Sequence, residues 1–229
     1  MPRWLFTIAL FLCSAALQAQ EYVGRYDFFG GFTYLDSPHI HLSERGFHFQ
    51  TGVHVRRWLV FGFDYSVATG HTSLEPTYLT TQLQQQLSSQ LGPLIAAGLV
   101  PSSYRLSVPF DSKSQTFAAG PQIDVHHFSW GTVFVRPSIG AIHEDATLHP
   151  ADPIANMIVA QFAPSRTKTD WVAFYGFGGG ASIRITDHFA IRAQADFVHD
   201  HLFSDLLKDG RNTVRLSIGP SFQFGSNVR

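Results

Sequence analysis

Two stretches near the C-terminus alternate apolar and polar residues one for one. In the first, the apolar positions are Phe189, Ile191, Ala193, Ala195 and Phe197. In the second, they are Val214, Leu216, Ile218, Pro220, Phe222 and Phe224. A period of two indicates β-strands, because successive side chains leave a strand on opposite faces. Both runs exceed the roughly 5–6 residues of an ordinary strand, and long strands with one apolar face are typical of transmembrane β-barrels.

Similar alternation marks eight segments of the chain. They are Tyr22–Leu35, Glu44–Arg56, Trp58–Thr69, Ser114–His127, Thr132–His143, Asp170–Ile185, His188–His199 and Arg211–Phe224. Short turns at 56–58, 128–131 and 186–187 alternate with longer connections at 36–42, 70–113, 144–169 and 200–210. Outer-membrane barrels have short periplasmic turns and long extracellular loops. The sequence therefore predicts an all-β fold, an eight-stranded antiparallel up-and-down transmembrane β-barrel with both termini on the periplasmic side.

The composition supports a membrane barrel. Charged residues make up 14% of the chain, against roughly 25% in soluble domains. After the N-terminus, no segment approaches the ~20 consecutive apolar residues of a transmembrane helix. The net charge is −1 and the sequence has no Lys/Arg cluster, which argues against a nucleic-acid partner.

The N-terminus has the organisation of a signal peptide over residues 1–19. Arg3 is the positive end, Trp4–Leu12 the apolar stretch, and Leu17–Ala19 the small-residue cleavage site. Residues 20–229 then form the barrel domain. Because Cys13, the only cysteine, lies in this peptide, we expect neither disulfides nor Cys-ligated metals in the mature chain.

Two of the long loops, about 70–113 and 144–169, are predicted to contain helices. In Pro76–Val100 leucines recur four residues apart, at Leu79, Leu83, Leu87 and Leu91. Gly92 and Pro93 are expected to kink or split this helix. A second short helix is expected over Pro153–Phe162, with its proline in the first turn. The helices either fold over the barrel mouth or form a docking surface, and the first is favoured because an amphipathic stripe is usually packed.

The kind of polar residue identifies which face points inward. The three lysines and four glutamates lie in loops or at strand ends, whereas a soluble barrel would carry them along its wet face. The polar positions of the strands instead carry Arg25, Asp27, Asp64, Asp124, Arg136, Arg184, Arg192, Asp196 and Arg215. Charges of both signs suit a narrow lumen in which they must pair. An eight-stranded barrel is just wide enough for its side chains to fill it.

Counting back from the short turns predicts two interior salt bridges, Asp124 with Arg136 and Asp196 with Arg215. A lumen closed by such pairs excludes a diffusion porin, which needs about 16–18 strands. A periplasmic aromatic girdle is expected around the short turns, at Trp58, Phe128, Trp130 and Phe189.

The C-terminal part of the chain resembles a known family. The residues that carry the likeness are Gly176–Ile191, its continuation through Arg192–His199, and the closing stretch Asn212–Gly225. They are similar to the outer-membrane β-barrel domain family related to the OmpA-type transmembrane domain. The resemblance implies an eight-stranded barrel inserted by the outer-membrane assembly machinery, and little about activity. The chain departs from the family in ending beyond Phe224, and a cell-wall tether is not expected because no peptidoglycan-binding domain is present.

Two kinds of chemistry compete with a purely structural interpretation. Rim histidines could bind a divalent metal with Glu144, Asp145 and Asp200, although a tolerated rim position explains them better. These histidines are His39, His41, His71, His143, His149, His199 and His201. His199, Ser204 and Asp205 could form a catalytic triad, but no G-x-S-x-G context accompanies them. We therefore expect no catalytic residues, no cofactor and no metal site.

The sequence favours an exported, non-catalytic protein of the bacterial outer membrane with a structural or surface-interaction role. Its expected partners are outer-membrane lipids, the barrel-assembly machinery and an extracellular partner of the long loops. The alternative is an outer-membrane lipid-modifying enzyme, an acyltransferase or deacylase. A soluble periplasmic ligand-binding barrel is a third hypothesis.

Overall fold

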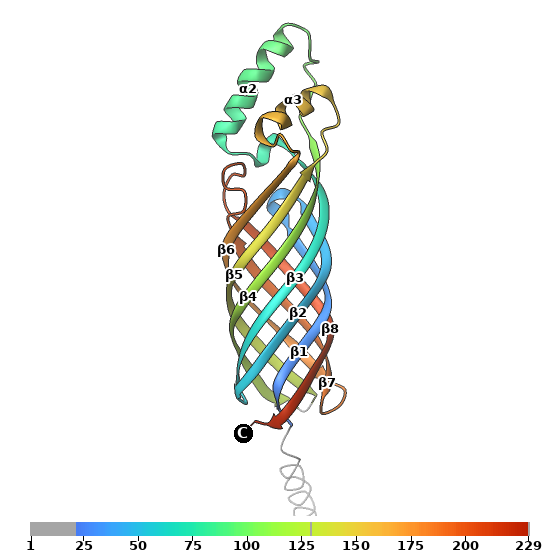
Figure 1. Cartoon of the computed structure of the whole chain (residues 1–229), viewed down its shortest axis with the longest axis vertical. Helices are drawn as coiled ribbons and strands as arrows, with labels where there is room; N and C mark the ends of the chain where they lie inside the picture. The colour runs from blue at the N-terminus through green and yellow to red at the C-terminus, as the bar shows by residue number, and fades with distance from the viewer. Residues whose placement is uncertain (1–21, 129, 229) are drawn as a thin grey trace, which may run out of the picture.

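The structure is a computed structural model that describes residues 22–128 and 130–228, so the predicted signal peptide lies outside the described residues. Eight antiparallel strands form a closed barrel in which each strand pairs with the next and β8 pairs with β1 (Figure 1). The strands are β1 Gly24–Ser37, β2 Leu42–Arg56, β3 Leu59–Leu74, β4 Val108–Phe128, β5 Gly131–Leu148, β6 Thr167–Arg184, β7 Phe189–Asp200 and β8 Arg211–Asn227. The predicted number, order and direction of strands are confirmed.

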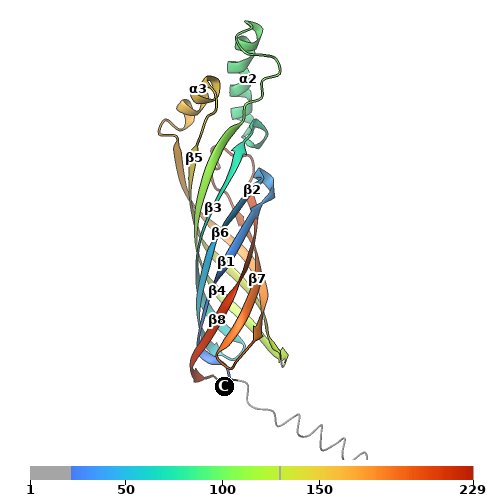
Figure 2. The ribbon, with the colours of Figure 1, turned by 90° about the vertical axis from the view of Figure 1, so that its right-hand side faces the viewer.

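Several strands are longer than predicted. β4 has 21 residues and begins at Val108, while β5 has 18 and ends at Leu148. The extra residues lie at the end with the long loops, where β3, β4, β5 and β6 extend upward beside one another (Figure 2). The barrel wall is therefore higher on this side than on the β1–β8 side.

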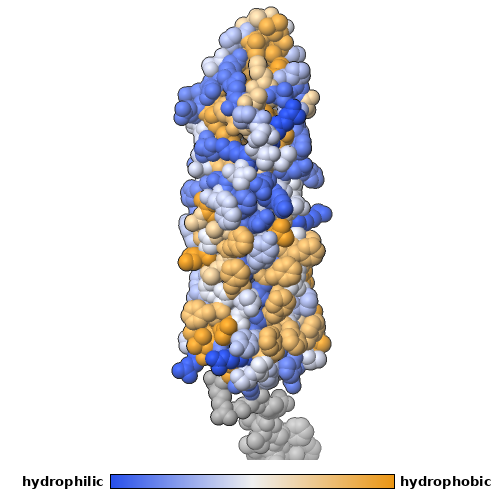
Figure 3. Space-filling view, viewed as in Figure 1, coloured by the Kyte–Doolittle hydropathy of each residue, from blue (hydrophilic) through white to orange (hydrophobic). Residues whose placement is uncertain are grey.

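The lower part of the barrel carries an apolar outer surface (Figure 3). Outward-facing side chains such as Phe47, Phe61, Ile139 and Phe177 are more than half exposed. An exposed apolar belt of this extent suits a hydrocarbon environment and not water. Among the described residues, no helix is long and apolar enough to cross a membrane.

Aromatic side chains border this belt at both ends. Trp58, Phe128 and Trp130 are exposed at the short-turn end, and the rings of the last two stack 5.2 Å apart. Toward the other end, Phe117 lies 5.1 Å from Tyr65 and 6.1 Å from Trp171. Such rings suit the two membrane–water interfaces.

The long loops contain two α-helices, α2 Thr81–Ala96 and α3 Pro153–Phe162, and two short 3₁₀ turns, η1 Pro38–Ile40 and η2 Pro76–Tyr78. α3 has the predicted bounds and begins at its proline, with Asp152 as N-cap. α2 begins later than predicted and continues through Pro93, so the predicted split is absent.

The helices do not fold over the barrel mouth as favoured from the sequence. They stand beyond the end of the barrel, above the long β3–β6 wall (Figures 1 and 2). Their apolar stripes are nevertheless buried, because Leu87 of α2 packs in one cluster with Ala155, Ile158 and Val159 of α3. We call α2, α3 and the connecting segments 76–105 and 149–166 the helical head.

Candidate functional site

The barrel interior is the most densely charged part of the molecule, and its centre is a four-residue cluster. Arg215 of β8 contacts Asp196 at 2.9 Å and Asp64 at 3.1 Å, and Arg136 of β5 contacts Asp64 at 2.5 Å. All four side chains are buried, and two acids balance two arginines. His48 completes the cluster, with Nε2 3.6 Å from Asp64. Buried charges are tolerated when they are paired in this way.

A second polar group lies toward the short turns. Arg192 pairs with Asp27, and its guanidinium carbon lies 5.2 Å from the centre of the Phe134 ring. Beside it, His54 lies 3.3 Å from Asp124. Gln122 donates to the same Asp124 carboxylate at 2.7 Å.

A third polar group lies below the helical head. Arg211 contacts Glu144 at 2.7 Å and Asp200 at 3.2 Å. The Ser112 hydroxyl lies 2.9 Å from Glu144 and 3.0 Å from Glu44. Because a hydroxyl has one hydrogen, Ser112 can donate to only one of these two carboxylates at a time. This group has three acids for one arginine.

An apolar plug covers the third group. Leu202, Phe203 and Leu207 of the β7–β8 loop pack in one cluster with Phe110 and Ala146 of the strands. Two small apolar cavities, of about 50 and 60 Å³, adjoin the plug and the helical head. Both are smaller than the ~150 Å³ cavity that holds a benzene molecule, so this junction is well packed.

The structure places the nine sequence-predicted interior charges as follows. Seven are buried inside the barrel, namely Asp27, Asp64, Asp124, Arg136, Arg192, Asp196 and Arg215. Arg184 is half-buried near the short-turn end. Arg25 is exposed, so its interior placement is wrong. The β1–β8 register shifts beside it, because β8 carries an extra residue around Gly225.

One of the two predicted salt bridges is present and the other is wrong. Asp196 and Arg215 are register partners and are in contact. Asp124 and Arg136 both point inward, but the register places Asp124 opposite Phe134, two residues away. Phe128 pairs with Gly131 at the turn, which alone would place Asp124 opposite Val135, and an extra β4 residue between Val125 and Phe128 shifts the register by one more position. Arg136 therefore reaches Asp64, and Asp124 pairs with His54.

Sequence reasoning missed the third group. Glu44 and Glu144 were assigned to a strand end and a loop, yet both are almost fully buried inside the barrel. The alternation of the strand could have shown their burial, because Glu44 lies on the same inward face as His48 and Gln50. Likewise, Glu144 continues the inward series of Arg136.

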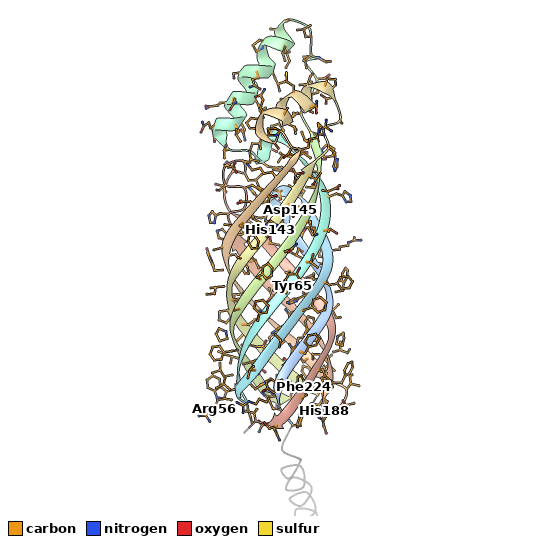
Figure 4. All side chains as sticks on the ribbon, in the orientation of Figure 1. Arg56, Tyr65, His143, Asp145, His188 and Phe224 are labelled. Atoms are coloured by element: carbon orange, nitrogen blue, oxygen red, sulfur yellow. The ribbon has the colours of Figure 1, made fainter. Side chains whose placement is uncertain are left out.

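The rim histidines mostly have partners of their own. His143 stacks on Trp171 at 4.4 Å and lies 3.5 Å from Asp145, on the outer surface (Figure 4). His149 contacts Asp111 at 2.9 Å. In the described part of the chain, no group of three or more His, Cys, Asp or Glu residues could hold a metal ion.

The residues of the candidate triad interact with other groups. His199 Nδ1 lies 2.7 Å from the side-chain oxygen of Asn212, and its ring packs against Tyr175. Asp205 pairs with Lys168. Ser204 is exposed on the β7–β8 loop. These contacts do not give the Ser–His–Asp hydrogen-bond chain that nucleophilic catalysis needs.

The helical head differs from the barrel interior in carrying almost no charge. Segments 76–104 and 153–165 contain no Asp, Glu, Lys, Arg or His. The head is held together by its apolar cluster and by neutral contacts, such as the 3.0 Å hydrogen bond from Gln90 to Gln161. It offers a partner neutral polar and apolar groups.

Comparison with known proteins identifies the fold. No protein-family model and no curated protein matches the sequence. Among solved structures, Neisserial surface protein A (NspA) is 11% identical, with a TM-score of 0.52 over 87% of this chain and 96% of that chain. Ail, the attachment invasion locus protein of Yersinia pestis, crystallised with the heparin analogue sucrose octasulfate, is 15% identical, with a TM-score of 0.45 over 90% and 100%. The N-terminal β-barrel domain of Pseudomonas aeruginosa OprF is 12% identical, with a TM-score of 0.41 over 88% and 99%.

The likeness to NspA, at this identity, is a likeness of fold. Together with the closed strand order, it confirms the predicted fold, a closed eight-stranded antiparallel β-barrel like that of NspA.

Proposed function

We propose that this protein is an outer-membrane barrel that conducts no solutes and presents its helical head to an extracellular partner. The observation that supports the proposal is that groups of side chains close the barrel at several successive heights. Three paired polar groups fill the barrel from the short turns upward, and the apolar plug covers the last of them. An eight-stranded barrel is just wide enough for its own side chains to fill it, and ion pairs hold these side chains in place, so solutes have no path.

Conductance in a planar lipid bilayer tests the closed lumen. The refolded protein should give no stepwise currents at concentrations at which a 16-stranded porin, used as positive control, gives many. Regular single-channel steps from the pure protein would contradict the proposal.

The proposed location is tested by fractionation of the natural host. The full chain should be exported, lose its first residues and sediment with outer membranes, and the folded and heated forms should migrate differently on gels. A soluble periplasmic barrel would instead be released by carbonate extraction, and that result would overturn the location.

We also propose that the protein is not an enzyme. This rests on the separate partners of His199 and Asp205. Incubation with lipopolysaccharide or phospholipid followed by mass spectrometry should detect no acyl change. A change that appears with the protein and is lost in His199→Ala would establish the lipid-modifying alternative.

A further inference from the structure

The outermost point of the helical head is apolar and exposed. Leu99, in the turn after α2, is 73% exposed, and Leu94 and Ile95 in the last turns of α2 are partly exposed. We call these three residues the tip. α2 starts above the barrel and rises along the long axis, so the tip is the part of the molecule farthest from the short turns (Figure 1). The same end is apolar in the space-filling view (Figure 3).

The tip has a defined shape. Gly98 has a φ of +70°, the left-handed conformation that ends many helices. The Leu99 amide donates to the Leu94 carbonyl at 3.0 Å, and the Gly98 amide donates to that of Ile95 at 3.0 Å. An apolar residue after such a glycine usually packs back on the helix. Here most of the Leu99 side chain remains in solvent, while the next residue, Val100, is buried.

The surroundings of the tip restrict its partner. No charged side chain lies between residues 76 and 104, so the tip makes no ion pair and attracts neither anionic nor cationic surfaces. The tip is also a protrusion and not a groove, so it suits a surface that deforms around it. A bilayer interface deforms in this way and accepts leucine and isoleucine side chains.

We propose that the tip inserts into the interface of a second, electrically neutral membrane opposite the outer membrane that holds the barrel. The proposal rests on the proposed surface role and names its partner as a zwitterionic lipid surface. Three aliphatic side chains give weak binding to one molecule, so many copies in one membrane must act together.

Fluorescence quenching tests the insertion. Leu99→Trp protein in nanodiscs of ordinary lipid is mixed with vesicles of brominated phosphatidylcholine. Tryptophan at position 99 should show a blue shift and at least twofold quenching, both unchanged between 50 and 500 mM salt. Gln85→Trp, at an exposed position on the polar face of α2, is the matched control and should stay unquenched. Wild-type protein, measured in the same way, gives the background fluorescence of the native tryptophans.

A second variant tests the same contact without a probe. Proteoliposomes that carry the Ile95→Asp, Leu99→Asp variant should co-float with neutral vesicles at least tenfold less than proteoliposomes that carry the wild type. The heat-dependent gel mobility of the variant should be unchanged. Equal quenching at positions 85 and 99, or binding that needs anionic lipid and disappears with salt, would overturn the proposal. Capture of a protein partner without vesicle binding would overturn the proposed lipid partner but would leave the proposed surface role unchanged. Porin-like currents, by contrast, would contradict the proposed closed lumen and would not bear on the lipid contact.

Discussion

Arg215 is the most connected charge of the barrel interior. Its guanidinium contacts two buried carboxylates, Asp64 and Asp196. Arg215→Met keeps an apolar stem of similar length but leaves Asp196 without its cation. Removal of one partner from a buried pair costs about 3–5 kcal/mol, so we expect a loss of this size in the free energy of unfolding. Urea titration of the folded, gel-shifted form in detergent measures it.

Lys113→Met is the matched control for this loss. Lys113 lies on the exposed face of β4. A surface substitution of this kind usually changes the free energy of unfolding by no more than about 0.5 kcal/mol in either direction. A midpoint for Arg215→Met equal to that of Lys113→Met would mean that the central cluster does not stabilise the barrel.

Gly178 makes room for the same cluster. A Cβ atom at this position would lie 2.0 Å from Asp196 Oδ1, which no side chain tolerates without moving. Gly178→Ala should therefore push the carboxylate away from Arg215 and lower the urea midpoint. In Gly30→Ala, by contrast, the nearest neighbours of the new methyl group are ring atoms of Phe49 and Phe28 at 3.4 Å or more, so its midpoint should stay near that of the wild type. Equal effects of the two substitutions would show that lumen crowding is not the cause.

For single residues, the sequence predicted the face of the strand on which each side chain lies, but not the residue that it contacts inside the barrel. Alternation correctly placed Asp196 and Arg215 inside, because a strand has only two faces. The partner of Asp124 depended on the turn pairing of Phe128 with Gly131 and on one added residue between Val125 and Phe128, neither of which composition or period reveals. Alternation also places Glu44 inside, and β2 continues two residues beyond the predicted start, to Leu42, so Glu44 is not at the strand end.

At the element scale, the predicted strands lie where hydrophobic periodicity is strong, and they end too early where it fades. The upper part of β4, for example, carries Asp111 and Lys113 outside. These positions lie above the apolar belt, where outward residues need not be apolar. The alternation of apolar and polar residues therefore disappears there, although the strand pairing continues. α2 continues through Pro93, and the leucine spacing that predicted the helix marks the face that packs on α3.

The start of α3 depends on Asp152. Its Oδ1 atom accepts hydrogen bonds from the amides of Ile154 at 2.9 Å and Ala155 at 2.8 Å, and the Tyr104 hydroxyl donates to the same carboxylate. Burial and this neighbouring charge raise the pKa of Tyr104 to about 12, so the tyrosine remains a donor at neutral pH. We expect Asp152→Ala to destabilise the helical head locally, by about 1 kcal/mol for the cap alone.

Limited trypsin digestion measures this local change, because Arg105 follows Tyr104 in the exposed loop. Cleavage at Arg105 should be several-fold faster in Asp152→Ala, with the barrel still resistant. Asp152→Asn keeps a good N-cap and should be cleaved close to the wild-type rate. The expectation is wrong if all three proteins are cut equally fast.

Across the part of the molecule that the structure describes, two apolar clusters have different roles. The plug cluster joins strands and the β7–β8 loop, while the head cluster joins α2 and α3, and among the described residues Leu74 and Leu148 border both. The start of the head also bonds to the plug loop, through hydrogen bonds from the Thr80 amide to Leu206 and from the Lys208 amide to Tyr78. The interior ion pairs belong entirely to strand residues. The barrel thus has its own stabilising contacts, and the head adds a surface without completing the lumen.

This separation predicts that the head can be removed from the barrel. Replacement of residues 81–105 and 153–163 by short Gly-Ser linkers removes both helices together, so that neither leaves an apolar face exposed. The shortened protein should refold, keep its heat-dependent gel mobility and give no bilayer current, because all three polar groups and the plug remain. It should also lose binding to neutral vesicles. Failure to refold, with the wild type refolding under the same conditions, would show that the head is part of the folding unit; new channel steps would show that the head, and not the lumen, closes the barrel.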